Sequence, residues 1–431
     1  MPGQVEAVML GAGNRGFFAH GPAALAHPEE LRFTAVAEPD PDRRRRFGAE
    51  HRISPERQLG SADELWAAGQ LAEALFNCTP DDQHFRTTCQ ALDQGYQVML
   101  EKPMATTAEE SRRLVELAER RGSILAVAHV LRYTPFFSTL HSILESGELG
   151  EVVSVEHREN VAHWHMAHSF VRGHWRRLEG GSPMILAKCC HDLDLLSWNL
   201  GPVARLSSFG SLRHFRPGQA PPGAPLRCDE GCPAEEECAF SATRLYLGEA
   251  TGWPVNAISE DLSLEGRRLA LSTGPYGRCV YRCDNDVVDH QVVALEFESG
   301  ATGVLTMQGH SHEEARTMRY DGTRATLRGR FQKLRGNHLE IHRHRDGRAR
   351  ELLPDSGHDD HGGGDTGLMR AFVRAVWRAR QGGLATDVVD ASDTIASARD
   401  CLHGHLLAFA AEESRIIGSV VAPQSLQEVG A

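Results

Sequence analysis

One short segment, residues 187–196, places several polar groups in an otherwise apolar run. Its apolar periodicity predicts a helix. Lys188, His191 and Asp194 are spaced so that they form a column on one face of that helix. Such a column can hydrogen-bond a polyol, and an imidazole, with an ordinary pKa near ~6.5, can remove a hydroxyl proton. We therefore take Lys188, His191 and Asp194 as candidate catalytic residues. The alternative is a helix that only caps and packs a domain interface.

A glycine-rich loop suggests a site for a second reactant. Gly11-Ala12-Gly13-Asn14-Arg15-Gly16 joins a strand-like apolar run, residues 5–10, to a helical pattern over 17–25. This is the strand–turn–helix setting of a dinucleotide-binding loop. Gly11 permits the tight turn, Gly13 lets the pyrophosphate approach the backbone, and Gly16 lets helix and strand pack closely. The helix start supplies amide donors, so the predicted cofactor set here is Gly11, Gly13, Asn14, Arg15 and Gly16.

An acidic residue at the end of the next strand indicates which dinucleotide is bound. The strand-like run 31–37 ends at Glu38, about 22 residues beyond Gly16. A carboxylate there can accept hydrogen bonds from the adenosine ribose hydroxyls, which favours NAD over NADP. Two alternatives remain open: Glu38 is a strand-end surface acid, or the arginine run 43–46 accommodates a 2′-phosphate.

A charged element follows a later strand-like run, residues 97–100. Glu101-Lys102-Pro103 comes directly after it, at the strand end where parallel α/β sheets bind ligands. Lys102 is therefore a second candidate base beside His191. Its alternative role is a strand-end lysine paired with Glu101.

The glycine loop, Thr79-Pro80 with His84 downstream, and Glu101-Lys102-Pro103 together resemble the Gfo/Idh/MocA family of NAD(P)-dependent oxidoreductases. The resemblance covers nearly the whole chain. It implies that Lys102 contacts the nicotinamide ribose and the substrate, orients the substrate and assists proton transfer. It also implies that Thr79, Pro80, His84, Glu101 and Lys102 belong to the cofactor site.

The resemblance extends to the polar helix. The family carries DxxxHxxD there, with the histidine beside the reacting hydroxyl; His191 and Asp194 match this motif, and Ala187 stands where the first acid is usual. It also implies that His129 and Arg132, at the crossover from the first domain, contact the substrate. Their alternatives are a strand-end histidine and an interdomain salt bridge.

Residues 164–176 are rich in His, Trp and Arg, a composition that suits a carbohydrate pocket and is also found in surface loops. His165, His168 and Arg172 are the substrate candidates from this segment, besides Lys188 and His191. Further along, His361 and three glycines precede Asp365, which we expect to cap a helix over 366–380.

Five cysteines lie in two clusters: Cys228, Cys232 and Cys238 follow a Pro/Gly-rich stretch, and Cys279 and Cys283 come later. Converging thiolates can form a structural zinc site, for which we take Cys228, Cys232, Cys238 and Cys283. The alternatives are independent thiols and a disulfide. We treat residues 216–245 as a cysteine-rich insertion.

These residues need two kinds of scaffold. Strand-like runs at 5–10, 31–37, 74–78, 97–100 and 123–129 alternate with helical patterns, which predicts a doubly wound parallel sheet. We place this Rossmann domain at 1–132. Residues 133–431 form the substrate-binding and oligomerisation domain, for which the resemblance implies an α/β fold with a large, mostly antiparallel open sheet.

Composition narrows the class of protein. The chain has 431 residues, 41% hydrophobic and 24% charged, which excludes a disordered or fibrous protein. A net charge of −12 argues against a general nucleic-acid or anionic-membrane surface. No apolar run approaches the ~20 residues of a membrane span, and the first strand begins at Val5. We therefore expect a cytoplasmic protein.

Three functions are compatible with these features. The first is reversible oxidation of a secondary hydroxyl on a sugar, cyclitol or sugar derivative with NAD(H). The second is an NAD-dependent glycoside hydrolase that oxidises its sugar transiently, without net redox change. The third is an NAD- or sugar-sensing protein, which leaves Lys102, His191 and Asp194 without a catalytic task. By resemblance, the chain forms a homodimer or homotetramer.

Overall fold

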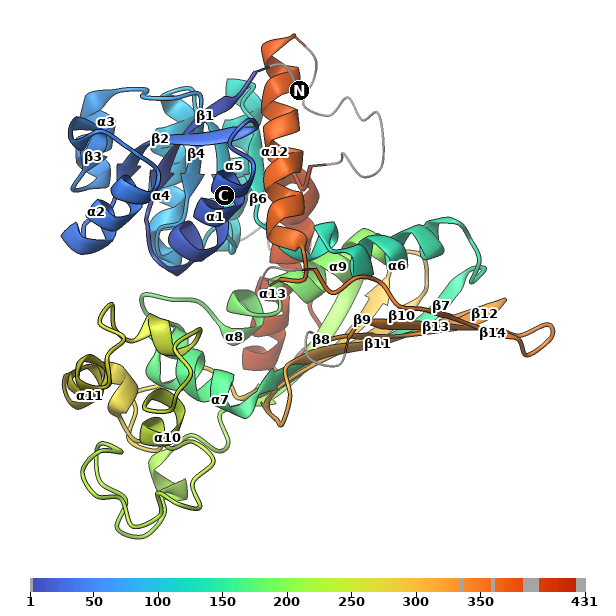
Figure 1. Ribbon diagram of the computed structural model, residues 1–431. Coiled ribbons are helices and arrows are strands. Elements are labelled where there is room, and N and C mark those ends of the chain that lie inside the picture. Colours follow the sequence, from blue (N-terminus) through green and yellow to red (C-terminus); the bar gives the residue numbers. More distant parts are fainter. Residues whose placement is uncertain (1–2, 333–335, 358–360, 383–394, 424–431) are drawn as a thin grey trace.

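The computed structural model describes residues 3–332, 336–357, 361–382 and 395–423. Two sheets organise this part of the chain (Figure 1). The predicted fold class, a Rossmann sheet combined with an α/β half that carries a large, mostly antiparallel open sheet, is confirmed.

The first sheet is parallel throughout and has the order β3-β2-β1-β4-β5-β6, the strand order of a dinucleotide-binding fold. Its strands are rich in buried Val, Leu, Phe and Ala because helices cover both faces. The strands are β1 Val5–Leu10, β2 Leu31–Ala37, β3 Gln58–Leu59, β4 Ala74–Asn77, β5 Gln97–Leu100 and β6 Leu125–Val127.

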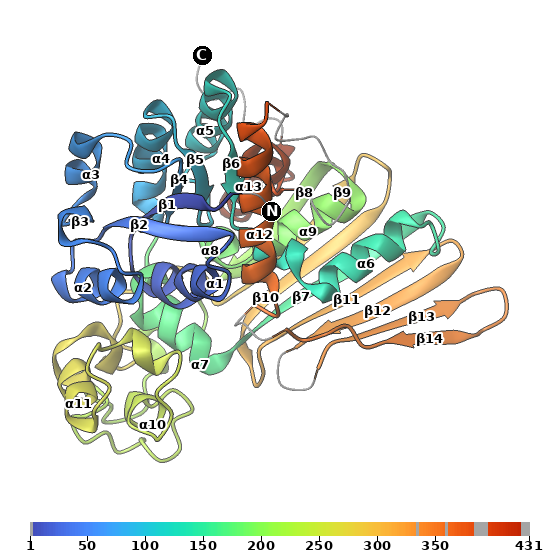
Figure 2. The same ribbon diagram turned by 45° about the horizontal axis from the view of Figure 1, so that its top comes forward.

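Helices connect these strands and cover the sheet (Figure 2). The helix predicted over 17–25 is present: residues 14–26 are helical without a break, and the part at Gly16–His20 has π-helical hydrogen bonding before α1. The helices of this half are α1 Gly21–Ala26, α2 Pro41–Glu50, α3 Ala62–Ala68, α4 His84–Asp93 and α5 Ala108–Arg121.

The second sheet has the order β14-β13-β12-β11-β7-β10-β9-β8 and is antiparallel except where β10 runs parallel to β7. Helices α6 and α9 lie on the face turned toward the Rossmann half, and within the described residues no helix covers the other face (Figure 1). The strands are β7 Val152–Ala162, β8 Val203–Ser211, β9 His290–Phe297, β10 Thr302–Ser311, β11 Ala315–Gly322, β12 Ala325–Phe331, β13 His338–Arg343 and β14 Ala349–Leu352.

The polar segment 187–196 is not one helix. Helix α8, Met184–Ala187, ends before Lys188, and α9, Cys190–Leu200, begins after it. Lys188 and Cys189 therefore form a break between two helices, and the predicted column of Lys188, His191 and Asp194 is divided at its first member. The other helices of this half are α6 Pro135–Glu145, α7 His163–His165, α12 Gly364–Arg380 and α13 Ala398–Ile417.

The last helices return to the Rossmann half. Helix α12 stands beside it and α13 lies between the two halves (Figure 1). Ahead of α13, the Val127 amide donates to the Ala396 carbonyl at 3.0 Å, and Ala126 forms an antiparallel bridge with Ser397, so the edge of β6 is paired. The last helix that the structure describes begins at Ala398.

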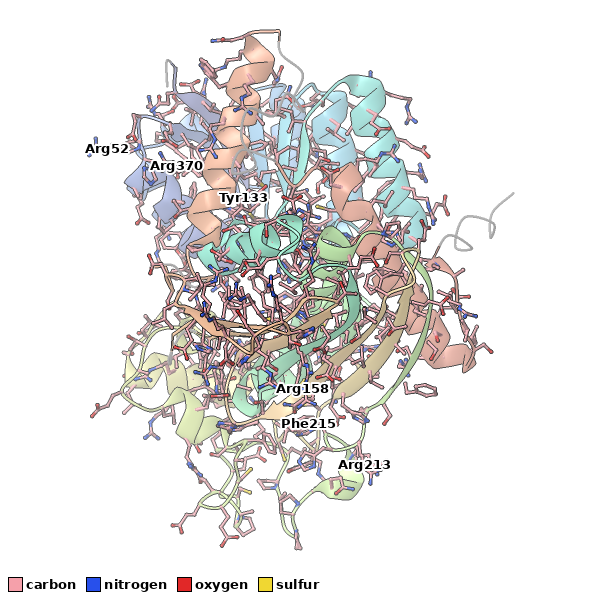
Figure 3. All side chains as sticks on the ribbon, turned by 90° about the vertical axis from the view of Figure 1, so that its right-hand side faces the viewer. Arg52, Tyr133, Arg158, Arg213, Phe215 and Arg370 are labelled. Atoms are coloured by element: carbon pink, nitrogen blue, oxygen red, sulfur yellow. The ribbon has the colours of Figure 1, made fainter. Side chains whose placement is uncertain are left out.

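Residues 212–289, between β8 and β9, form a separate lobe below the Rossmann half (Figure 1). This lobe contains the short helices α10 Ala242–Tyr246 and α11 Leu264–Thr273. Phe215, near its first residues, is buried and stacks on His310 of β10 (Figure 3). In the described chain, no helix is long and apolar enough to cross a membrane.

Candidate functional site

The glycine loop has the geometry that a dinucleotide needs. Gly11 has a φ of +89°, and a Cβ there would lie 2.6 Å from the Cys78 carbonyl oxygen. A Cβ on Gly16 would lie 2.3 Å from the Gly11 carbonyl oxygen, so this glycine is required for close packing. A Cβ on Gly13 would meet nothing within 4 Å, and the neighbouring Asn14 is exposed. The loop is thus held at both ends and open in the middle, where a pyrophosphate would approach.

Glu38 lies beside this loop at the end of β2. Its carboxylate accepts hydrogen bonds from the Ala12 amide at 2.7 Å and the Asp40 amide at 2.9 Å. Three of the four arginines of α2 are engaged elsewhere: Arg43 and Arg46 pair with Glu260 of the lobe, and Arg45 pairs with Asp42. Arg44 donates to the Glu38 carbonyl. This arrangement suits an unphosphorylated adenosine ribose.

Arg15 ties the loop to two distant segments. Its guanidinium donates to Glu101 at 2.7 Å and to Asp365 at 2.6 Å. Burial opposes ionisation of Glu101, but Arg15 and a hydrogen bond from His20 outweigh it and hold the pKa of Glu101 below its usual range. Asp365 does not cap its helix as expected: the N-cap is Gly363, and the Asp365 carboxylate pairs with Arg15 and His361.

Thr79, Pro80 and His84 form the next strand-end loop. The His84 ring lies 2.8 Å from the Thr79 carbonyl oxygen through Nε2 and 2.6 Å from the Pro103 carbonyl oxygen through Nδ1. His84 therefore connects the loop after β4 to the loop after β5, which carries Lys102.

Lys102 contacts the end of helix α8 through a single hydrogen bond. The Lys102 ammonium donates to the Ala187 carbonyl oxygen at 2.8 Å, and it lies 5.6 Å from the Trp175 ring centroid. Ala187 is the position where the resemblance leads one to expect an acid. A backbone oxygen therefore accepts from Lys102 there, and this contact brings Lys102 to the start of the segment that carries His191.

His191 is buried, and its surroundings keep it neutral. Burial and the positive charge of Lys102 hold the pKa of His191 well below the ordinary value of 6.5, and burial does the same for His129. The two rings meet edge to face at 5.3 Å. Nδ1 of His191 and both ring nitrogens of His129 have no hydrogen-bond partner in the described part of the chain. Buried polar atoms usually have a hydrogen-bond partner, so these ring nitrogens are available to a bound water or a polar ligand.

Asp194 and Arg132 form a buried bidentate pair. Nε of Arg132 donates to Oδ2 of Asp194 at 2.7 Å, and the NH2 nitrogen of Arg132 donates to Oδ1 of Asp194 at 2.6 Å. His129 lies beside the pair, 3.6 Å from Oδ2 of Asp194. Arg132 therefore forms the interdomain salt bridge that was its alternative role, and this pair holds both carboxylate oxygens of Asp194.

Lys188 points to the open sheet. Its ammonium lies 3.2 Å from Glu159 on β7 and 3.0 Å from Glu314. Burial works against its charge, yet Glu314 and Glu159 raise the pKa of Lys188 above its ordinary value. Lys188 is therefore a fixed cation that donates hydrogen bonds, not a base.

The sheet contributes a second polar network that the sequence analysis did not identify. Asp192 accepts from Nε2 of His157 at 2.8 Å and from Nε of Arg316 at 2.8 Å, and Arg316 also lies 2.9 Å from Glu159. His157 and Glu159 alternate on the buried face of β7. The sequence could have indicated this network, because the alternation of β7 places a histidine and a glutamate on the buried face of the strand.

The His- and Trp-rich segment divides between two places. His165 donates to Glu314 at 2.8 Å, and burial lowers its pKa. His168 stacks on Tyr276 of the lobe at 4.8 Å, and burial lowers its pKa to about 3. Arg172 is fully buried and donates to the carbonyls of Phe240 and Arg278. His168 and Arg172 therefore join the lobe rather than the Lys102 site.

Trp175 and Asp81 are two further residues that sequence reasoning missed. Nε1 of Trp175 donates to Asp81 at 3.1 Å, and the Ser182 hydroxyl donates to the same oxygen at 3.2 Å. His174 lies against Trp175, with ring centroids 3.9 Å apart. These contacts hold segment 174–182 against the strand-end loops of the Rossmann half, next to Lys102.

The four cysteines that lie together differ in one member from the set predicted for a zinc site. Cys228, Cys232, Cys238 and Cys279 line one cavity, whereas Cys283 lies outside it and its thiol donates to the Cys279 carbonyl at 3.4 Å. None of the ten cysteines, all of them within the described residues, forms a disulfide.

Two family models match the chain. The model of an oxidoreductase family with an NAD-binding Rossmann fold, GFO_IDH_MocA, matches residues 5–129, and the GFO/IDH/MocA C-terminal domain model matches residues 137–328.

Individual relatives match shorter stretches. YteT of Bacillus subtilis (strain 168), which carries the name of an oxidoreductase, is 26% identical over 267 residues, 60% of this chain and 58% of that protein. The trans-1,2-dihydrobenzene-1,2-diol dehydrogenase of Bos taurus is 33% identical over 154 residues, 35% of this chain and 44% of that protein. The chain thus covers less than two thirds of the length of these relatives.

Solved structures share the fold over nearly the full chain. An inositol dehydrogenase homolog from Azotobacter vinelandii, complexed with NAD⁺, superimposes with a TM-score of 0.69 at 18% identity and covers 98% of both chains. A levoglucosan dehydrogenase, complexed with NADH and levoglucosan, superimposes with a TM-score of 0.69 at 16% identity and covers 97% of this chain and 99% of its own.

Proposed function

Because the chain belongs to the Gfo/Idh/MocA family of NAD-binding oxidoreductases, we propose that it interconverts a secondary alcohol and a ketone on a sugar, cyclitol or sugar derivative. One observation supports this proposal most directly. Lys102 is bound to the Ala187 carbonyl. Burial and the nearby charge of Lys102 lower the pKa of His191, which packs against His129 in a buried, neutral pair. The inositol and levoglucosan dehydrogenases with the same fold support the substrate class.

We assign the cofactor site to the glycine loop and Glu38, with NAD preferred over NADP. Gly13 leaves the backbone accessible, Glu38 is fixed by two amides, and the arginines of α2 are committed to other partners. When bound, NAD⁺ supplies the acceptor for the hydride that leaves the alcohol carbon.

The proton leaves by a separate route. His191 is neutral at pH 7, so an unprotonated ring nitrogen can take the hydroxyl proton as the carbonyl forms. An ammonium has three donors, and Lys102 uses one on Ala187, so it can hold the substrate oxygen with another. Lys188, a permanent cation, and His165 are placed to bind further hydroxyls through the network around Glu314. Asp194 and Arg132 are bound to each other and pack beside His129, so we assign them a structural role next to the site.

The test is a substrate panel. The full-length protein is incubated with NAD⁺ and a set of free sugars, cyclitols and glycosides while NADH absorbance and released aglycone are followed together. We expect NADH to accumulate in proportion to turnover. His191→Asn and Lys102→Met should each lower kcat by about a hundredfold or more. The exposed His312→Asn is the matched control and should leave kcat unchanged. Full activity in His191→Asn would exclude the proposed base.

A second function is favoured by one observation. Glu260 of the lobe pairs with both Arg43 and Arg46, on the helix that follows Glu38, and such a bridge suits a cofactor that stays bound. An NAD-dependent glycoside hydrolase keeps its cofactor and returns it to its starting state in each cycle. In the same panel, aglycone release without net NADH would identify the hydrolase, and NADH formation would identify the dehydrogenase.

We also propose that the chain forms a homodimer or homotetramer through the uncovered face of the open sheet. Phe209 is 65% exposed on an edge strand, and Arg158 lies on the face turned away from the helices (Figure 3). Light scattering on the eluting protein gives the mass directly, and a monomer would contradict this assignment. The ten free cysteines fit a reducing compartment, and we assign the protein to the cytoplasm.

A further inference from the structure

The lobe formed by residues 212–289 has only a small apolar core of its own, because its buried residues Phe215, Val280 and Val287 belong to the core of the open-sheet half. Its own hydrophobic cluster contains four buried residues: Ala242, Tyr246, Val255 and Leu271. Helices α10 and α11 are its longest regular elements, and the rest is irregular. Small modules with so little core need a disulfide, a metal or a partner to hold their shape. This lobe contains no disulfide.

One cavity in the lobe brings four cysteines together. Cys228, Cys232, Cys238 and Cys279 line it, and its volume is about 20 Å³. This is more than the ~10–15 Å³ that one water-sized sphere requires, so the cavity has room for a single small occupant. The remaining wall combines proline, alanine, valine and aromatic side chains with the polar residues Arg172, Arg227, Glu235 and Ser241.

The backbone explains why these four cysteines converge. The Cys228 amide donates to the Gly277 carbonyl and the Cys279 amide donates to the Leu226 carbonyl, both at 2.8 Å. This short antiparallel bridge pairs Arg227 with Arg278, and it places Cys228 and Cys279 on neighbouring segments, diagonally across the bridge, although they are far apart in the sequence. A turn, in which the Cys238 amide donates to the Ala234 carbonyl at 2.9 Å, brings Cys232 and Cys238 to the same place.

A buried cation next to the cavity forms no ion pair with a carboxylate in the described residues, although Glu235 lines the same cavity. Arg172 is 0% exposed and also lines the cavity; its NH2 nitrogen lies 3.6 Å from Sγ of Cys228. Its other hydrogen bonds join it to the neutral carbonyls of Phe240 and Arg278 and to the side chain of Tyr246, and its NH1 nitrogen has no hydrogen-bond partner in the described part of the chain. Buried charges are normally paired, so this arginine indicates negative charge at the cavity. Four thiolates around a divalent cation carry a net charge of −2, which Arg172 would partly balance.

We propose that Cys228, Cys232, Cys238 and Cys279 bind a structural Zn²⁺ ion that orders the lobe. Each thiol releases its proton to solvent as it becomes a ligand, and no electron is transferred. Within the described chain no three of these sulfurs lie within 4.8 Å of one another, whereas Zn–S bonds of ~2.3 Å set them ~3.8 Å apart. Binding therefore rotates the side chains inward around the cavity. This assignment replaces Cys283 of the expected set by Cys279.

The lobe that the metal orders reaches the candidate site. The ring centroids of Trp253 of the lobe and His165 lie 4.8 Å apart, and His165 hydrogen-bonds Glu314, which also pairs with Lys188. Glu260 joins the lobe to α2. The ion thus has a structural task, and its effect on activity is indirect.

The test measures metal content of the full-length protein purified without chelator. We expect about one zinc per chain, as for a Cys₄ site. Cys232→Ser and Cys279→Ser should lower the zinc content at least about tenfold, whereas the matched variant Cys283→Ser should retain it. X-ray absorption on the wild-type protein should give four sulfur ligands at about 2.3 Å, a result that does not depend on variants folding.

Three results would overturn the proposal. Wild-type protein without stoichiometric zinc, even after refolding with added Zn²⁺, would exclude the site. A brown protein containing iron and sulfide would replace zinc with an iron–sulfur cluster. Loss of zinc in Cys283→Ser with retention in Cys279→Ser would exclude the ligand set. None of these readouts involves turnover, so they are independent of the proposed enzyme activity.

Discussion

At the scale of single residues, the ion-pair partners of Lys188, His191 and Asp194 indicate which of the three can transfer a proton. Asp194 and Lys188, both candidates for catalysis from their spacing with His191, are held by opposite charges: Asp194 by Arg132 and Lys188 by Glu159 and Glu314. His191 is the member that has no such partner and is neutral. A buried ion pair fixes geometry, and a buried neutral imidazole moves protons.

Removing the charge of Asp194 should destabilise the protein. Asp194→Asn keeps the shape but leaves the buried Arg132 without a counter-ion, which we expect to cost about 3–5 kcal/mol of unfolding free energy. Denaturant unfolding measures this loss. Glu296→Gln, which breaks the exposed pair with Arg205, is the control and should change stability by less than about 1 kcal/mol. Equal losses of unfolding free energy in the two variants would show that the buried Asp194–Arg132 pair contributes no more to stability than an exposed ion pair.

Glu38 should set the choice of dinucleotide. Glu38→Gln retains an acceptor for the Ala12 amide but removes the charge that discriminates against a 2′-phosphate. We expect the affinity for NADH to fall about tenfold, ~1.4 kcal/mol, and that for NADPH to fall less. Fluorescence titration with both cofactors gives the ratio, with the exposed Asp42→Asn as control. An unchanged NADH/NADPH ratio would move the discrimination to other residues.

At the scale of elements, the glycine loop contains one glycine that the packing of the fold requires and another that leaves space for the cofactor. Gly16 is surrounded by backbone and Gly13 is open, so the same added methyl group has different consequences at the two positions. The loop is tied down from both sides, by Glu38 through the Ala12 amide and by Arg15 through Glu101.

We expect Gly16→Ala and Gly13→Ala to give opposite phenotypes. Gly16→Ala places a Cβ 2.3 Å from a carbonyl oxygen and should destabilise the fold by about 1–3 kcal/mol. Gly13→Ala should leave the melting temperature nearly unchanged and weaken NADH binding about tenfold or more, since the methyl occupies the pyrophosphate's approach. Calorimetric melting and NADH titration separate the two. Wild-type NADH affinity in Gly13→Ala would place the pyrophosphate elsewhere.

The ionic contact between α2 and the lobe should act on cofactor release. Glu260→Gln breaks both of its arginine pairs, and we expect faster NADH dissociation, by no more than about fivefold because the groups are partly exposed. Stopped-flow displacement measures the rate. The wild-type rate should rise with salt and approach that of the variant, and a wild-type rate insensitive to salt would argue against this contact.

Local signals carried most of what the sequence predicted correctly. The glycine loop and the parallel strands are encoded by contiguous residues. The break at Lys188, the network of Asp192, His157 and Arg316, and the choice of Cys279 over Cys283 depend on strand pairing and bridges between distant segments. Spacing along the chain does not record which segment will lie opposite.

At the scale of the whole molecule, several histidines are buried without charge. Burial lowers the pKa of His405 and of His168 to about 3, and it holds those of His129 and His191 well below 6.5. The unfolded chain binds protons at these groups below about pH 6.5, whereas the folded protein does not. The stability that they contribute is therefore complete above pH 6.5 and is lost as the pH falls from there toward 3.

We expect unfolding free energy to decrease by about 1.4 kcal/mol per pH unit for each such histidine between pH 6.5 and pH 4.5. Urea unfolding at intervals across this range measures the slope. His405→Gln, although less stable at every pH, should reduce the slope by one histidine's share, and the exposed His312→Asn should not. A flat profile between pH 6.5 and 4.5 would mean that these imidazoles are not buried as neutral groups.

The pairing of β6 with residues near Ser397 has a consequence for biosynthesis. The edge strand of the nucleotide-binding sheet pairs with a segment that leaves the ribosome roughly 270 residues later. The ion pair of Arg15 likewise cannot form until Asp365 has been synthesised. At about 5–20 residues per second, the emerging N-terminal half spends roughly 15–50 seconds without its final neighbours. During translation, that half therefore exposes an open strand edge, which makes it a natural client for nascent-chain chaperones.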